Sequence, residues 1–455
     1  MFKKVARYTL AFFVVLLMLN PSYAEEVSNE ELVKEIQALK ARVAELEKKL
    51  SAQTERSCKL TDEMAVVKEK MITCTPGEGI IVEGAGLSIG AGVTFVAQGT
   101  PDANNTGGTE DDVFDAEFTA DVEIEKEFDD WGLAFLHLEA GQNDGIEGGL
   151  SLFSNVNRDA GDTGASFDAT EWWYEHYFLD KDVILRVGKM DASCFVDQNE
   201  YAHCEITQFL GRIFRNSPAV EFPSDNAFGA NIHLCVEPLT FAEFEAGYYE
   251  ADADWENIFD NPFYTAQVNI KPVDLSEESL RSGNYRIYGW INDRHHTKLV
   301  DLGSAVSTER EKLNYGFGIS CDQELADGIG IFGRYGWQRP DIMPADATAG
   351  TPPDMPTVEH AWSAGIEISG TYWMRDDDAL GFAVGQAFPS GEYDDAGGGD
   401  SAEGHIETYY SCKINDCLTL SPDLQLIWNP NGIDDEPGVD DDAIFVYGLR
   451  GQFDF

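Results

Sequence analysis

The last thirteen residues of the chain, 443–455, alternate between apolar and polar side chains. One side carries Phe445, Tyr447, Leu449, Phe453 and Phe455, and the other carries Val446, Gly448, Arg450, Gln452 and Asp454. A half-buried strand of a soluble protein also alternates in this way. Here, however, the apolar side is aromatic to the last residue and the polar side includes charges, as in a strand between lipid and a watery lumen. The pattern therefore favours a transmembrane β-barrel.

Strand-like segments recur from Gly86 onward, separated by clusters of Gly, Asp, Asn and Pro. The segments that we identify are 87–98, 113–128, 131–141, 170–180, 183–190, 226–237, 240–250, 262–273, 283–293, 312–322, 327–338, 358–371, 378–388, 404–414, 416–428 and 441–455. They number sixteen, an even count as in bacterial single-chain barrels, and sixteen strands enclose an aqueous channel. The predicted fold is an all-β transmembrane barrel of 16 antiparallel strands over residues 80–455, preceded by an α-helical coiled-coil segment.

The spacing between segments predicts which loops lie on each side of the membrane. Short gaps such as 129–130 and 181–182 are typical of periplasmic turns, and the long gaps are expected to be external loops. The longest loop, 191–225, contains a short helical pattern around Arg212 and Arg215, and we expect it to fold inward as a constriction. The alternative is that Phe209 and Phe214 only pin the loop to the barrel wall.

The N-terminal region has a different pattern. Lys3, Lys4 and Arg7, an apolar core and a small-residue site before residue 25 predict a signal peptide over residues 1–24. From Leu32 to Met71 apolar residues then follow one heptad register, which predicts a coiled coil. We expect residues 25–75 to form a periplasmic stalk that joins copies of the chain, with the number of copies left open.

Export makes disulfide bonds available to the cysteines. Cys412 and Cys417 flank a tight turn and are expected to face each other across a hairpin, while Cys194 and Cys204 are placed to close the long loop. Cys58 and Cys74 bracket the end of the stalk helix, and either an interchain disulfide or unlinked or intrachain thiols fit there.

Charge and motifs exclude several function classes. The formal net charge is -51, from 82 acidic against 31 basic residues, so nucleic acid is not an expected partner. The eight histidines are scattered and no catalytic or metal-ligating motif is found, so we expect neither an enzyme, nor a cofactor, nor a metal site. Acidic clusters in the expected external loops are either solvated or bridged by divalent cations to lipopolysaccharide.

Several segments resemble the OprB-like carbohydrate-selective porin family. They are Gly188-Lys189-Met190-Asp191 with Phe195, Asp197, Asn199, Tyr201, Ala202, Glu205, Thr207 to Leu210, Phe214, Asn216, Pro218 and Phe222-Pro223; Gly283 with Tyr285, Tyr288 and Trp290; Asp322 to Leu325 with Phe332 to Trp337; and Glu407, Tyr409-Tyr410, Pro422 to Gln425 and Asn429-Pro430. The resemblance implies a 16-stranded outer-membrane channel that admits sugars by diffusion. Cysteines at 194 and 204, the heptad stalk and the strong acidity depart from the family pattern, which bears on sugar preference more than on channel formation.

A sugar at a narrow point exchanges water for hydrogen bonds from the wall and stacks its apolar faces on aromatic groups. The candidate channel-lining residues are Arg186, Lys189, Asp191, Glu205, Arg212, Arg215, Arg286, Tyr288, Trp290 and Arg334. For each of them a structural place in a charge ladder is the alternative. We expect passive diffusion of small carbohydrates, with a cation-preferring general porin or a structural tether to the cell wall as alternatives. The expected partners are outer-membrane lipid and lipopolysaccharide, further copies of the chain and the cell wall.

Overall fold

The structure is a computed structural model. It describes residues 33–34, 37–38, 40–46, 48–49, 51, 72–77, 79–105, 112–159, 166–223, 226–235, 241–272, 281–298, 310–311, 313–343, 345, 358–395, 399–433 and 443–455. The chain divides into two units, Met1–Met71 and Ile72–Phe455. The expected signal peptide, 1–24, lies outside the described residues.

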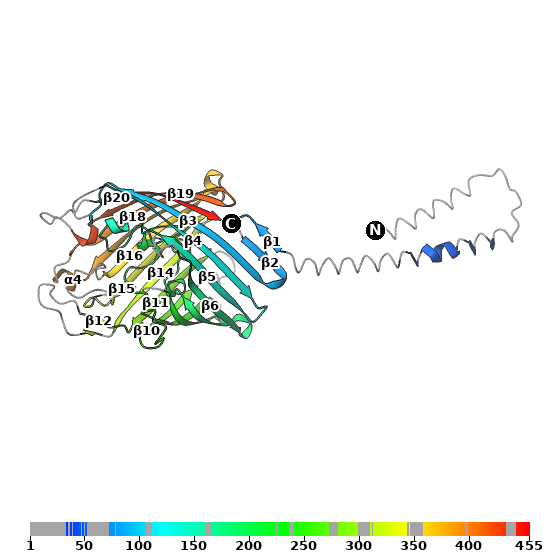
Figure 1. The fold of residues 1–455 in the computed structure, drawn as a ribbon, viewed down its shortest axis with the longest axis horizontal. Helices are drawn as coiled ribbons and strands as arrows, with labels where there is room; N and C mark the ends of the chain where they lie inside the picture. Colours follow the sequence, from blue (N-terminus) through cyan, green and yellow to red (C-terminus); the bar gives the residue numbers. More distant parts are fainter. Residues whose placement is uncertain are drawn as a thin grey trace. The chain divides into compact units, whose positions relative to one another are not determined.

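Sixteen long strands of the second unit form one closed antiparallel barrel within the described residues (Figure 1). They are β3 (Leu87–Thr100), β4 (Val113–Glu127), β5 (Gly132–Gln142), β6 (Asp168–Phe178), β7 (Val183–Met190), β8 (Ala227–Leu234), β9 (Ala242–Glu250), β10 (Pro262–Ile270), β11 (Gly283–Asn292), β14 (Asn314–Ala326), β15 (Ile329–Gln338), β16 (Val358–Ser369), β17 (Ala379–Pro389), β18 (Glu403–Asn415), β19 (Leu418–Trp428) and β20 (Ile444–Asp454). The barrel closes where β20 pairs with β3, from Tyr447 opposite Gly99 to Asp454 opposite Gly92. The sixteen-stranded barrel is therefore confirmed, and each strand ends within four residues of its predicted bounds.

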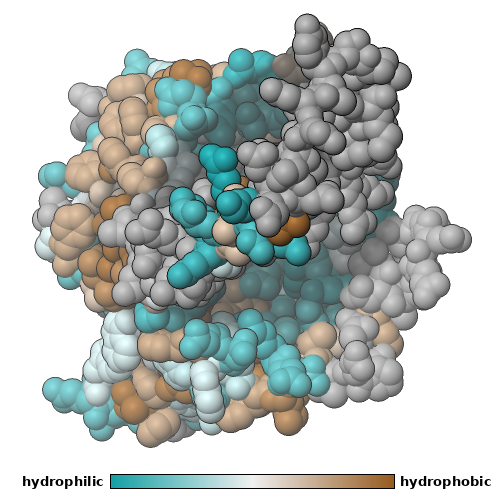
Figure 2. All heavy atoms as spheres, turned by 90° about the vertical axis from the view of Figure 1, so that its right-hand side faces the viewer, coloured by the Kyte–Doolittle hydropathy of each residue, from teal (hydrophilic) through white to brown (hydrophobic). Residues whose placement is uncertain are grey.

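Alternation along each strand separates an outer apolar face from an inner polar face. On β11, Tyr285, Ile287 and Ile291 are exposed, whereas Arg286 and Trp290 between them are buried. Directly paired residues share a face, so Ile287 opposes the exposed Ile319 of β14. Viewed from one end, hydrophilic residues recede into a hollow while hydrophobic residues gather on the outer flank (Figure 2). The wall thus has the inverted polarity that a lipid-embedded channel requires.

The remaining described elements are short. Helical turns are η1 (Glu83–Ala85), η2 (Glu147–Gly149), η3 (Leu179–Lys181), η4 (Ala192–Cys194), α3 (Arg212–Arg215), η6 (Gly370–Trp373), α4 (Gly391–Asp395) and η7 (Pro430–Gly432). Strands β12 (His296–Thr297) and β13 (Arg310–Glu311) pair with each other in the loop between β11 and β14. No described helix is long and apolar enough to cross a membrane.

The predicted end of the stalk is wrong. Strands β1 (Ile72–Thr75) and β2 (Gly79–Val82) are found there rather than helix, and β2 pairs with both β1 and β3. Pro76 and Gly77 lie in the β1–β2 turn, where Gly77 has a φ of +79°. The hairpin belongs to the barrel wall because its backbone groups pair with β3, which a helix at this position could not do.

The described residues between 33 and 51 are helical, as the heptads predict. Val33, Val43 and Leu46 expose their apolar side chains on this helix. A coiled coil also requires a second helix packed against the first, and the described part of residues 33–51 contains one helix alone. The coiled coil therefore stays a prediction.

The two expected barrel disulfides are not formed. Strand pairing places Cys412 opposite Leu420 instead of Cys417, because β18 continues to Asn415 and leaves Cys417 in the two-residue turn. Cys412, Cys417, Cys194 and Cys204 all have free thiols, as has Cys74. Cys58 lies outside the described residues.

Candidate channel site

The connection between β7 and β8 packs against the inner face of the barrel. We call its described part, residues 191–223, the inner loop. It begins where the Asp191 side chain accepts a hydrogen bond from the Ser193 backbone N–H and so caps η4. The helical pattern predicted within the loop is found at α3 (Arg212–Arg215).

Three inward-facing side chains on distant strands hold the inner loop. Arg334 on β15 donates to the backbone oxygens of Phe214, Asp197 and Ala202. Glu407 on β18 accepts the backbone N–H groups of Leu210 and Gly211, at 2.6 Å and 2.9 Å. Arg450 on β20 donates to the backbone oxygens of Glu205 and Gln208, at 2.5 Å and 2.8 Å. Charged groups that bond to loop backbone satisfy polar atoms that would otherwise be buried without partners.

Aromatic packing completes the attachment of the loop. Phe209 contacts Phe332 and Tyr409 of the wall, with ring centroids 5.7 Å and 4.9 Å away, and Phe214 contacts His405 at 5.1 Å. Phe209 and Phe214 are both buried. These two rings therefore pin the loop to the wall, and the inward constriction stays a prediction.

Gly211 is required by how closely the loop approaches the wall. A Cβ atom there would lie 2.8 Å from Glu407 Oε2 and 2.8 Å from His405 Cε1. These are distances that real Cβ atoms do not adopt, and both neighbours are themselves buried. Only glycine, which has no Cβ, can approach the wall closely enough for its backbone N–H to donate to the Glu407 carboxylate.

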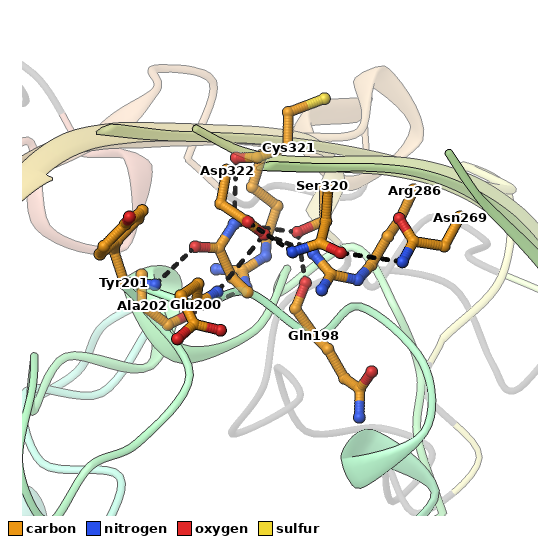
Figure 3. A network of polar contacts seen from close by, with 12 residues as sticks. Gln198, Glu200, Tyr201, Ala202, Asn269, Arg286, Ser320, Cys321 and Asp322 are labelled. Atoms are coloured by element: carbon orange, nitrogen blue, oxygen red, sulfur yellow. Dashed lines mark hydrogen bonds and ion pairs between the residues drawn. The ribbon is translucent and has the colours of Figure 1, made fainter. Parts of the chain in front are cut away.

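A second contact region joins the inner loop to β14 (Figure 3). Asn199 donates to the Ser320 hydroxyl and to the Cys321 backbone oxygen, both at 3.1 Å. The Asp322 carboxylate accepts a hydrogen bond from the Glu200 backbone N–H and also forms an ion pair with Arg286 on β11. The network ties the loop to two adjacent strands, so its position is fixed on several sides.

A cavity of about 200 Å³ lies between the inner loop and the wall. Its lining includes Arg186, Glu245, Gln267, Asn269 and Arg286 from the strands and Phe195 from the loop. The Arg186 guanidinium lies 5.2 Å from the Phe195 ring centroid and pairs with Glu175 and Glu245. Charged and amide groups thus surround an aromatic face.

A cluster of charges within the inner loop faces Arg158 of the loop between β5 and β6. Arg215 pairs with Glu205 at 2.9 Å and with Asp191 at 3.8 Å. Burial alone would raise the pKa of Glu205, but Arg215 and Arg158 hold it at about 2. Burial, with Arg158 and Arg215 nearby, lowers the pKa of Arg212 to about 10. The carboxylate of Glu205 is therefore anionic at neutral pH beside Arg215 and Arg158.

The predicted site residues fall into four groups. Arg186 and Arg286 line the cavity. Asp191, Glu205, Arg212 and Arg215 belong to the charge cluster of the inner loop. Tyr288, Trp290 and Arg334 face inward as predicted, but the inner loop covers them and they are buried, so they do not line open water.

Lys189 forms the fourth group. It pairs with Trp172 of β6 and with Phe228 of β8, and Trp172 is exposed on the outer face. Paired residues share a face, so the register places Lys189 on the outer side of the wall. That position does not fit a channel-lining role, and we no longer count Lys189 among the candidate residues.

Sequence reasoning named Arg334 as a candidate channel-lining residue, but it did not identify Glu407 and Arg450 as residues that hold the loop. Arg450 was visible on the polar side of the last strand and Glu407 within the family resemblance, but nothing in the sequence indicates that their partners are loop backbone atoms. Arg158 was missed altogether, because it lies outside every patterned segment. Only the strand parity of Arg450 could have suggested a role inside the barrel.

Comparison with known proteins supports a porin. Residues 106–455 match the family model described as "Carbohydrate-selective porin, OprB family". The high-pH structure of Pseudomonas putida OprB matches with a TM-score of 0.65 and 15% identity, covering 81% of this chain and 94% of that one. A loop-deletion mutant of OmpT from Vibrio cholerae matches with a TM-score of 0.48 and 11% identity, covering 81% and 99%.

No curated protein matches the sequence of this chain. The family match nevertheless spans all but the first of the sixteen barrel strands. The fold of Pseudomonas putida OprB matches over a similarly large share of this chain. The fold and the family agree with each other on a channel of the bacterial outer membrane. The chain therefore belongs to the OprB family of carbohydrate-selective porins.

Proposed function

We propose that this porin passes small neutral sugars passively through a lumen narrowed by the inner loop. The cavity beside that loop is the observation that carries the proposal, because guanidinium, carboxylate and amide groups surround the face of Phe195 there. A sugar that enters exchanges its water for hydrogen bonds from these groups, and its apolar ring face stacks on the aromatic ring. The inner loop keeps this arrangement rigid because wall residues anchor it on several sides.

Swelling of liposomes that contain the purified protein tests this function. Vesicles are transferred into isotonic solutions of a monosaccharide, a disaccharide and a trisaccharide, and the initial swelling rates are compared. We expect rates that fall steeply with sugar size, with the monosaccharide fastest. Vesicles that conduct salt but swell in none of the sugars would contradict sugar permeation.

A cation-preferring general porin is the second candidate. Inward positions on β4 and β5 carry Glu117, Asp121, Glu123 and Glu139, so one side of the lumen is acidic. Fixed negative charge attracts cations to a pore. The reversal potential across a potassium chloride gradient decides between the two candidates: a strong cation preference without sugar flux favours the general porin.

We further propose that the N-terminal stalk joins copies of the chain in the periplasm. The exposed Val43 and Leu46 of its helix support this, because an apolar heptad stripe is stabilised by a partner helix. Deletion of residues 25–71 leaves the β1–β2 hairpin in place and removes only the stalk. We expect chemical cross-linking of that variant to give monomers, whereas an unchanged oligomer would assign assembly to the barrel.

Contacts with lipopolysaccharide and with the cell wall complete the proposal. Asp394 and Asp395 on α4 lie in a long loop on the side away from the short turns, where divalent cations could join them to phosphate groups. Sedimentation with purified cell-wall sacculi tests the tether: the full chain is expected in the pellet and the variant without residues 25–71 in the supernatant.

A further inference from the structure

Asp121, His137 and Glu139 lie together on the inner wall of the barrel. Asp121 is on β4, and His137 and Glu139 are on β5. One ligand atom from each of the three side chains lies within 4.8 Å of the others. They share the inner face with the buried Glu117 and Thr119, opposite in direction to the exposed Phe114 of the same strand.

Strand pairing makes the cluster rigid. Asp121 is directly opposite Glu139, and His137 is two residues away on the same side of β5. Like charges placed directly opposite in a sheet repel each other, so the carboxylates of Asp121 and Glu139 destabilise this pairing unless a positive charge lies between them. Glu139 is partly exposed, and one of its carboxylate oxygens lies within 4.8 Å of a ligand atom of both other residues.

Thr170 orients the histidine ring. Its hydroxyl lies 3.0 Å from His137 Nδ1, while His137 Nε2 lies 2.9 Å from Asp121 Oδ1. His137 pairs with Glu171 of β6, but the next residue, Leu138, pairs with Ala169, so Thr170 is the extra residue of a β-bulge. At this bulge its side chain turns toward the histidine ring. Bulges of this kind re-aim side chains beside functional sites, and a hydrogen bond at one ring nitrogen presents the other nitrogen to a metal.

We propose that Asp121, His137 and Glu139 bind a divalent transition-metal ion, such as zinc, in the lumen wall. One imidazole and two carboxylates are a ligand set that such ions accept, and three protein ligands leave a coordination position open to water. The ion neutralises the opposed carboxylates, which explains why two acids are paired across the strands without a fixed cation between them. Glu123 and Glu171 add negative charge beside the cluster, and Arg158 is the nearby positive charge.

The position of the cluster gives the ion a consequence for permeation. Glu171 pairs across the strands with His137 and accepts the backbone N–H of Asp191, where the inner loop begins. Glu139 also interacts electrostatically with Glu205 of the inner loop. A bound ion would therefore lie in the wall at the level of that loop, where it removes negative charge and occupies part of the lumen.

Zinc binding to the purified full-length protein is the first test. The protein is stripped with a chelator, its thiols are alkylated so that cysteines do not compete, and zinc chloride is titrated by calorimetry. We expect one tight site per chain, weakened at least about tenfold in His137→Ala and Asp121→Asn. Thr170→Val should weaken it by roughly tenfold through loss of ring orientation.

His176→Ala is the matched control, because His176 lies on the outer face of β6 and packs against Phe178. It removes an imidazole and should leave zinc affinity unchanged. Binding that is absent in the wild type, or that is equal in His137→Ala, Asp121→Asn and the wild type, overturns the proposal. Asp121→Asn preserves side-chain volume, so its barrel is expected to fold even if His137→Ala does not.

Single-channel conductance in planar bilayers is the second test. Micromolar zinc should lower the conductance of the wild type and of His176→Ala, and a chelator should restore it. His137→Ala should conduct equally with and without zinc, and an equal zinc effect in this variant would overturn the site. Liposome swelling by sugars in the absence of zinc is measured separately, so a failed metal site and a failed sugar channel give different results.

Discussion

Arg334 and Asp197 form an ion pair in which both side chains are buried. Arg334 Nε lies 2.9 Å from Asp197 Oδ1, and the side chains are 1% and 0% exposed. The second carboxylate oxygen of Asp197 accepts the Ser217 backbone N–H at 2.7 Å. A charged side chain of the wall thus pairs with a charged side chain of the inner loop. Through Asp197 this pair also holds Ser217, which follows α3 in the loop.

Arg334→Ala should release the inner loop without opening the barrel. Removal of one member of a buried pair leaves the other charge uncompensated, which costs about 3–5 kcal/mol. The wall remains because its strands are paired along their whole length. We expect faster proteolysis within residues 191–223 and a larger, noisier single-channel conductance.

Arg281→Ala is the control for this variant. Arg281 also pairs with acids, Asp327 and Glu324, but it does so on an exposed surface near the short turns. Such pairs contribute little to stability. Conductance and proteolysis should match the wild type, and equal effects of the two substitutions would refute the anchoring role of Arg334.

Glu147 makes the loop between β5 and β6 depend on pH. Burial raises the pKa of Glu147 to about 7, even though the backbone N–H groups of Asn157 and Val156 donate to its carboxylate. An unfolded glutamate titrates near pH 4.3, so between about pH 4.3 and 7 the ordered loop binds more protons than the open one. The stability of the loop therefore falls as the pH rises through this window.

Hydrogen exchange measures this dependence. After correction for intrinsic rates, amides of residues 143–159 should be better protected at pH 5 than at pH 8. Glu147→Gln should remove most of the difference. Glu205→Gln should keep it, since the pKa of Glu205 is about 2 and this group does not titrate in that range.

Arg186→Ala should weaken sugar binding in the cavity. Arg186 holds Glu175 and Glu245 in place beside Phe195, and hydrogen bonds to charged groups contribute about 1.5–3 kcal/mol. The apparent affinity for a sugar that blocks ion current should fall by about tenfold or more. Lys189→Ala is the matched control: it lies on the outer side of the wall three residues away, and a similar loss there would place both residues in the pore after all.

Ile287→Arg should destabilise the barrel in the membrane. Ile287 is 58% exposed on the outer face of β11, and arginine on the lipid side of a barrel costs about 2–4 kcal/mol near the midplane. Ile287→Leu keeps an apolar side chain of the same size and should be neutral. The measurement is unfolding by urea of protein refolded into lipid bilayers, and equal stabilities would mean that this face is not in contact with lipid.

The sequence by itself determined the wall of this protein. Each strand lies between lipid and water, so apolar and polar side chains alternate along it with a period of two. A strand such as β11 (Gly283–Asn292) can therefore be predicted from its own residues, without knowledge of the neighbouring strands. The same local signal identified the inward direction of Arg186, Arg286, Arg334 and Arg450. Residues of the family resemblance added the kind of channel, because they recur in order along the strands and the long loop.

Tertiary structure alone decided what the inward residues contact. Arg334 meets Asp197 across 137 positions of sequence, and Tyr288 and Trp290 are covered by a loop from another part of the chain. Strand register brought Asp121 to His137 and Glu139, and it separated Cys412 from Cys417 because the turn lies at residues 416–417 and not at 415 as predicted. Local alternation gives the face on which a side chain lies, whereas its partner depends on pairing and loop closure between distant segments, which no short-range pattern encodes.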